Sequence, residues 1–129
     1  MKNRILIIED DWMVLQLMKQ KLEKMGYVVA TAKNESDVWG LINENRIELI
    51  ILNICLRTKL GGKIYRSLVD ARVGQKIPFI ITTGITDKHQ PLRSFHDEGY
   101  IFFPKPVDFE TLHQEIEEVL SSGLNHHVA

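Results

Sequence analysis

The sequence predicts an α/β fold in which a single doubly wound sheet of five parallel strands is flanked by five helices. Short apolar runs alternate with longer segments of helical periodicity, five times along the chain. The run Leu49–Leu52 is apolar at every position, which is typical of a central strand covered on both faces. Five strand–helix units with right-handed crossovers in 129 residues suit the strand order 2-1-3-4-5.

The predicted strands are short and rich in β-branched or aromatic residues. The third strand follows Glu48, and Asn53 is expected where this strand leaves the sheet. The fourth begins with Ile77 and Pro78, a place where the missing N–H of proline is tolerated. The strands are expected at residues 4–8, 27–31, 49–52, 77–82 and 100–103.

The predicted helices carry apolar residues at steps of three and four. Asp11, Asn34 and Asp108 are expected to cap the first, second and fifth helices, and Gly26 to stop the first. Pro91 limits the fourth helix to a start near that residue. The helices are expected at residues 12–25, 34–45, 63–72, 87–98 and 108–120, with a loop at 57–62; residues 1–121 form one domain, and 122–129 a flexible C-terminal tail.

The composition is that of an ordinary globular domain, with 44% hydrophobic and 26% charged residues. The net charge of -1 offers no electrostatic case for direct nucleic-acid binding. The single cysteine, Cys55, excludes an internal disulfide, and no apolar run approaches the length of a membrane span. We therefore expect a cytoplasmic protein that does not bind membranes.

Polar residues occur where four of the predicted strands end, and these ends meet at one edge of a parallel sheet. Glu9 and Asp10 follow the first strand, and adjacent carboxylates of this kind suit Mg²⁺. Thr83 and Lys105 follow the fourth and fifth strands and suit a phosphoryl group. Asn53 is the difficulty, because a neutral amide does not form the acyl phosphate that a carboxylate there would form.

Five motifs of the sequence occur in the order and register of a known family. They are Ile-Leu-Ile-Ile-Glu-Asp-Asp from Ile5, Leu-Ile-Ile-Leu-Asn from Leu49, Gly61, Ile-Pro-Phe-Ile-Ile-Thr-Thr-Gly from Ile77, and Phe-Phe-Pro-Lys-Pro from Phe102. With these motifs the chain resembles a response-regulator receiver domain, a flavodoxin-like domain of the chemotaxis type, from residue 3 to about residue 121.

The resemblance implies a metal site for Mg²⁺. Glu9 and Asp10 would be the acidic pair, with Asp10 a direct ligand. Position 53 would be the phosphoacceptor and second ligand, and the backbone carbonyl of Cys55 the third. Asn53 stands where the family has Asp, so that Mg²⁺ should bind weakly or not at all.

The resemblance also implies a conformational switch. Thr83 would be the switch hydroxyl and Phe102 the aromatic switch residue. Lys105 would pair with the phosphoryl group, and Pro106 would be the cis-proline that orients it. Without a phosphoryl group, the inactive arrangement is expected, with Thr83 turned away from residue 53.

The function implied by the resemblance is that of a non-enzymatic signalling domain in a two-component phosphorelay. Its partners would be a histidine kinase or phosphotransfer protein, and a downstream protein or a second copy bound through the fourth helix, fifth strand and fifth helix. Asn53 would leave the domain deficient in phosphorylation and acting through protein contacts, whether this residue is native or an engineered replacement of Asp.

The alternative is a small flavodoxin-like enzyme or ligand-binding domain that uses the same edge of the sheet. A nucleotide or flavin site would need a phosphate-binding loop after the first strand. Glu9, Asp10 and Asp11 occupy that place, and they would repel phosphate unless a metal intervened.

Overall fold

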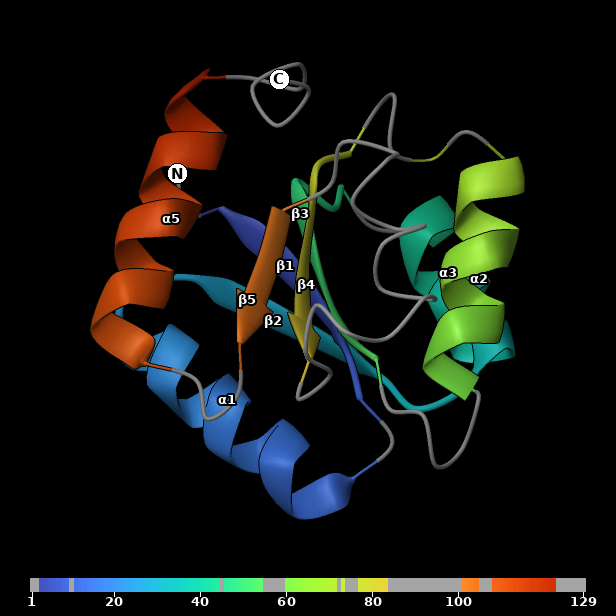
Figure 1. Cartoon of the computed structure of the whole chain (residues 1–129), viewed down its shortest axis with the longest axis horizontal. Coiled ribbons are helices and arrows are strands. Elements are labelled where there is room, and N and C mark those ends of the chain that lie inside the picture. Colours follow the sequence, from blue (N-terminus) through green and yellow to red (C-terminus); the bar gives the residue numbers. More distant parts are fainter. Residues whose placement is uncertain are drawn as a thin grey trace.

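The computed structural model describes residues 3–9, 11–44, 46–54, 60–71, 73, 77–83, 101–104 and 108–122 (Figure 1). The secondary-structure elements, in chain order, are β1 (Arg4–Ile8), α1 (Trp12–Lys24), β2 (Val28–Ala32), α2 (Glu35–Glu44), β3 (Leu49–Ile54), α3 (Leu60–Asp70), β4 (Phe79–Thr83), β5 (Ile101–Pro104) and α5 (Phe109–Ser122).

The strands form one parallel sheet in the order β2-β1-β3-β4-β5. β3 lies at its centre and pairs with β1 on one side and β4 on the other. The predicted parallel α/β fold of the flavodoxin type is therefore confirmed. The fourth predicted helix, at residues 87–98, lies outside the described residues, and so does most of the predicted tail.

Helices cover both faces of the sheet: α1 and α5 pack on one face, and α2 and α3 on the other (Figure 1). Alternate residues of β3 supply the two halves of the core. Ile50 and Leu52 pack with residues of α2 and α3, whereas Leu49 and Ile51 pack with α1 and α5. All four side chains are fully buried, as expected of a central parallel strand.

Local hydrogen bonds define the helix starts that the sequence predicted. The Asp11 carboxylate accepts the backbone N–H groups of Met13 and Val14, and so caps α1. Asn34 accepts the N–H of Asp37 ahead of α2. Asp108 likewise accepts the N–H of Glu110 at the start of α5. The three predicted caps are confirmed.

The largest difference from the predicted boundaries is in α3, which begins at Leu60 rather than at residue 63. The predicted loop at 57–62 was therefore too long. Gly61 and Gly62 lie in the first turn, where backbone N–H groups have no intrahelical partner in any case. The apolar repeat of the helix also extends back from Ile64 to Leu60 at a step of four residues, which favours the earlier start.

Strand boundaries also move, by one or two residues, because strand pairing sets them. β3 continues through Asn53 to Ile54, since these residues pair with Thr82 and Thr83 of β4. Asn53 is thus inside the strand rather than beyond it. β4 starts at Phe79, two residues later than predicted, and α5 runs to Ser122.

Candidate functional site

The carboxyl ends of four neighbouring strands meet at one edge of the sheet. Ile8 at the end of β1 is paired with Leu52 of β3. The next residue of β3, Asn53, is paired with Thr82. The last residue of β4, Thr83, is paired with both Ile54 of β3 and Pro104 of β5. The backbone therefore brings two of the predicted site residues, Asn53 and Thr83, to the edge at which β1 ends just before Glu9.

Glu9 is the described acidic residue at this edge. It follows β1 directly, and it is only 4% exposed. Its backbone N–H donates to the carbonyl oxygen of Ala32 at 3.2 Å, which extends the pairing of β1 with β2 by one residue. Its carboxylate accepts the N–H of Asp11 at 3.2 Å. The chain thus holds the buried Glu9 carboxylate in place between the end of β1 and the start of α1.

The backbone also locates three further site candidates. Asn53 is the penultimate residue of β3, Thr83 the last residue of β4 and Phe102 the second residue of β5, where it is paired with Ile81. The remaining candidates lie outside the described residues: Asp10, Cys55, Lys105 and Pro106. In the sequence, Cys55 directly follows Ile54, the last residue of β3, and Lys105 directly follows Pro104, the last residue of β5.

Thr82 is a buried residue of the site edge that the sequence analysis did not single out. It is fully buried on β4 and is paired with Asn53. Within the part of the chain that the structure describes, its hydroxyl has no hydrogen-bond partner. An unsatisfied buried hydroxyl costs stability, and it is an uncommon feature in a native core.

The oxygen groups at this edge fit a hard divalent cation. A buried carboxylate such as Glu9 is costly unless a donor or a cation compensates its charge. Mg²⁺ prefers carboxylate, carbonyl and amide oxygens, and retains several waters. Among the described residues, no three His, Cys, Asp or Glu side chains gather at one place. The structure therefore contributes Glu9 to such a site and, by backbone position, Asn53.

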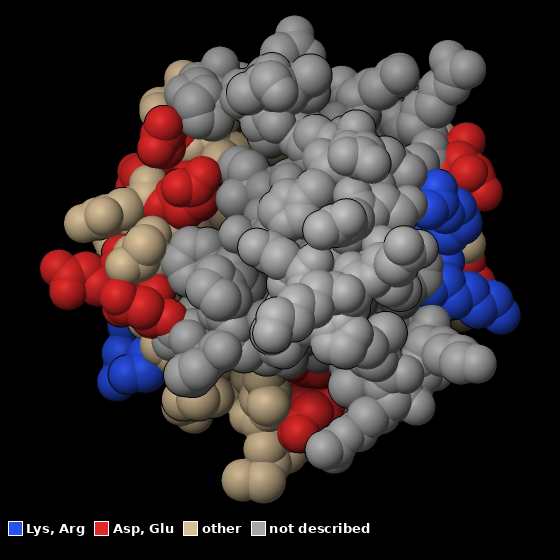
Figure 2. Space-filling model, viewed as in Figure 1, with Lys and Arg blue, Asp and Glu red and all other residues tan. Residues whose placement is uncertain are grey.

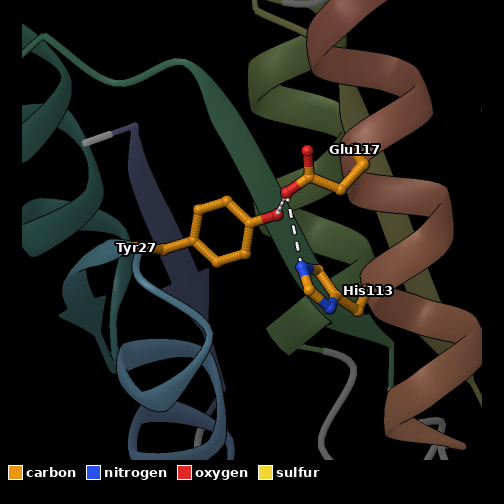
Figure 3. Close-up of polar contacts among 3 residues, drawn as sticks. All are labelled: Tyr27, His113 and Glu117. Atoms are coloured by element: carbon orange, nitrogen blue, oxygen red, sulfur yellow. Dashed lines mark hydrogen bonds and ion pairs between the residues drawn. The ribbon is translucent and has the colours of Figure 1, made fainter. Parts of the chain in front are cut away.

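A second polar cluster joins β2 to α5, and sequence reasoning missed it (Figure 3). Tyr27, just before β2, donates its phenolic hydrogen to the Glu117 carboxylate. His113 lies one helical turn earlier, with its Nε2 3.3 Å from the same carboxylate oxygen. The rings of Tyr27 and His113 meet edge to face at 5.8 Å. Only the four-residue spacing of His113 and Glu117 was visible in the sequence.

Sequence comparison with protein families matches residues 5–117 to the response regulator receiver domain. This match spans most of the chain, and it agrees with the strand order and the polar edge described above. The chain belongs to the response regulator receiver domain family.

Individual relatives are consistent with this assignment. The chain is 28% identical over 118 residues to the protein PilH of Pseudomonas aeruginosa, covering 92% of this chain and 98% of PilH. It is 25% identical over 119 residues to the transcriptional regulatory protein GlrR of Escherichia coli, covering 92% of this chain but 26% of GlrR. The chain thus spans about a quarter of the first curated relatives it matches and about half of others.

Solved structures share the fold. A CheY-like response regulator receiver domain protein from Methanospirillum hungatei superposes with a TM-score of 0.79 at 27% identity, covering 95% of this chain and 96% of the other. A two-component response regulator from Clostridium difficile gives a TM-score of 0.77 at 26% identity, covering 93% of this chain and 97% of the other.

Several properties are general to receiver domains. Receiver domains are signalling domains, generally not enzymes, and they interact with histidine kinases and downstream effectors. They generally bind Mg²⁺ at the phosphorylation site. Within the described residues, no helix has both the length and the apolar character needed to cross a bilayer.

Proposed function

We propose that this chain is a receiver domain whose signalling does not depend on phosphorylation, because Asn53 replaces the phosphoacceptor. The observation that carries the proposal is the position of Asn53 in β3. Asn53 is paired with Thr82, and the next residue, Ile54, is paired with Thr83. Both pairs lie at the edge of the sheet where Glu9 is buried. An amide at this position has no anionic oxygen with which to attack a phosphoryl donor. The domain then acts through contacts with other proteins.

The remaining site residues take the roles that the family implies. Glu9 and Asp10 hold Mg²⁺ together with the Asn53 amide oxygen and the backbone carbonyl of Cys55. Because Asn53 is neutral, the metal is bound more weakly than by a carboxylate at the same position. The site is supported by the burial of Glu9 and by the oxygen-rich chemistry of this donor set.

The proposed switch uses residues at the ends of β4 and β5. Thr83 supplies a hydroxyl and Lys105 a point charge to a group held at position 53. Pro106 orients Lys105. Phe102 is the aromatic switch residue, whose position changes together with that of Thr83. The pairing of Thr83 with Pro104, the residue before Lys105, supports the proximity that this switch needs.

The proposed partners are a histidine kinase or phosphotransfer protein, and a downstream protein or a second copy that contacts the fourth helix, β5 and α5. We take the domain as predicted at residues 1–121, extended by Ser122, which is the last residue of α5, and the residues after it as the tail. The alternative of a flavin- or nucleotide-binding enzyme is disfavoured, since the buried Glu9 carboxylate occupies the place of a phosphate-binding loop.

The test compares the wild-type chain with Asn53→Asp, using acetyl phosphate as the donor. In the variant, the new carboxylate oxygen attacks phosphorus and acetate leaves, so the intact mass increases by one phosphoryl group. The wild-type chain should show no increase. The reaction is run with Mg²⁺ and with excess chelator, and labelling of the variant should require the metal.

Two results would count against the proposal. Labelling of the wild-type chain would place a phosphoacceptor elsewhere in the sequence. Failure of a folded Asn53→Asp variant to react would mean that the edge lacks the geometry of a receiver site beyond this one side chain.

A further inference from the structure

Helix α1 presents an apolar surface to solvent, on the side opposite to its core contacts. Leu15, Met18 and Leu22 face the sheet and are buried. Among the residues that the structure describes, four large hydrophobic side chains are exposed, and three of them belong to α1. These are Trp12 at 58%, Met13 at 75% and Leu17 at 49% exposed, and they form what we call the α1 patch.

The geometry of the helix places two of the three residues of the α1 patch, Met13 and Leu17, on one stripe, whereas Trp12 lies about 100° around the helix from Met13. Met13, Leu17, Gln20 and Lys24 follow one another at steps of three and four residues, so they lie on one face, and all four are exposed. This face changes character along the helix. It is apolar from Met13 to Leu17 and polar at Gln20, and it ends in the cationic Lys24.

Charge is distributed unequally between the two ends of α1. The exposed Asp11 caps the N-terminal end, close to the buried Glu9. Lys21 and Lys24 lie in the last turn. Glu23 also lies there, so the last turn carries two positive charges and one negative charge. Neither Glu23 nor Asp11 lies on the stripe, since they are about 100° and about 140° around the helix from Lys24, and the two ends therefore differ in net charge rather than along one face. In Figure 2, blue atoms lie near one end of α1, tan atoms cover its middle and a red patch lies near its other end.

We propose that the α1 patch binds a second copy of this chain, with the two α1 helices antiparallel about a twofold axis near Leu17. A twofold contact requires one surface to complement itself. Here Leu17 meets Leu17 of the other copy on the axis. The antiparallel arrangement brings the acidic end of each helix, with Asp11, toward the basic end of the other, with Lys24.

This self-complementarity favours a second copy over a different partner. A parallel arrangement would place Lys24 against Lys24 and Asp11 against Asp11, which is unfavourable. Exposed Trp, Met and Leu side chains on one helix are typical of interface cores. The pair would cover the exposed face of the helix that follows Glu9 in the chain.

The test measures the molecular mass of the full chain by sedimentation equilibrium over a range of concentrations. The wild-type chain should show a reversible equilibrium between monomer and dimer. Leu17→Glu and Leu17→Lys each place two like charges on the axis, and each should raise the dimer dissociation constant at least about tenfold. An equimolar mixture of the two variants should recover dimers, because Glu now faces Lys.

Val28→Glu is the matched control. Val28 is the other exposed large hydrophobic residue among those described, and it lies on β2 rather than on α1. This variant should dimerise like the wild-type chain. Circular dichroism of all three variants should match the wild-type spectrum, since each changed side chain is exposed.

Several outcomes would overturn the proposal. The proposal is overturned if the wild-type chain stays monomeric at every concentration, even if a different protein is found to cover the α1 patch. A dimer that persists in both Leu17 variants would use another face. Variants that dissociate but do not associate with each other would exclude the twofold axis at Leu17. None of these outcomes depends on whether residue 53 accepts a phosphoryl group.

Discussion

The phenol of Tyr27 links two segments that are far apart in the sequence. Tyr27 precedes β2, and its hydroxyl donates to Glu117 on α5, 90 residues further along the chain (Figure 3). Burial, followed by the hydrogen bond to Glu117 and the negative charge of that carboxylate, raises the pKa of Tyr27 well above its ordinary value. The proton is therefore held more tightly in the folded chain than in the unfolded chain.

This raised pKa predicts a loss of stability in alkali. The unfolded chain releases the Tyr27 proton as the pH passes its ordinary pKa of about 10, whereas the folded chain retains it. The contribution of Tyr27 to stability is thus complete below pH 10, and it decreases as the pH rises further. This contribution is measured as the difference in the free energy of unfolding between the wild-type chain and Tyr27→Phe, obtained by urea unfolding at several pH values.

Tyr27→Phe should be destabilised by about 1 kcal/mol at neutral pH, through loss of the hydrogen bond. Its stability should then decrease less steeply than that of the wild-type chain above pH 10. Parallel pH profiles for the two proteins would mean that the phenol is not linked to folding in this way.

At the scale of elements, the turn after α1 depends on the backbone freedom of glycine. α1 ends with Met25 as its C-cap, and Gly26 follows with φ of 102°. Side chains other than glycine rarely adopt positive φ, because the Cβ atom crowds the neighbouring carbonyl. No atom lies within 4 Å of a Cβ built at Gly26, so the restriction is conformational rather than one of space.

Gly26→Ala should therefore lower the free energy of unfolding by about 1–2 kcal/mol. Gly40→Ala is the matched control, because Gly40 lies within α2, has no positive φ and also has open space around a built Cβ. This change should stabilise the chain by about 0.5–1 kcal/mol. Thermal and urea unfolding of both variants should give opposite signs, and equal signs would contradict the assigned backbone role.

At the scale of the whole molecule, the described side chains of the central strand are fully buried on both faces, whereas the edge strand β2 begins with an exposed side chain. Ile50 and Ile51 of β3 are both fully buried, the first against α2 and α3 and the second against α1 and α5. Val28 begins β2, which forms an edge of the sheet, and it is 43% exposed.

Truncation of either central isoleucine should be costly. Ile50→Ala and Ile51→Ala should each lower the free energy of unfolding by about 2–5 kcal/mol, because each leaves a cavity in a close-packed layer. Val28→Ala should cost less than about 1 kcal/mol. A large difference between the two isoleucine variants would show that one face of the sheet carries most of the stability.

The sequence by itself determined which polar residues stand at the ends of strands, and the candidate site is predicted from these positions. Glu9, Asn53 and Thr83 stand at strand ends in the sequence, and parallel topology brings such ends to one edge. The caps Asp11, Asn34 and Asp108 could also be predicted from the sequence, because a cap forms its hydrogen bonds within three residues of its own position.

Only the tertiary structure decided the features that depend on distant partners. β3 continues through Asn53 because β4 supplies paired residues there. Met13 and Leu17 are exposed although they are apolar, like the buried Leu15, since the sheet covers only one side of α1. The sequence by itself determined periodicity, capping and the order of strand ends, which are local properties. Pairing, exposure and the Tyr27–Glu117 contact were decided by the packing of segments remote in the chain.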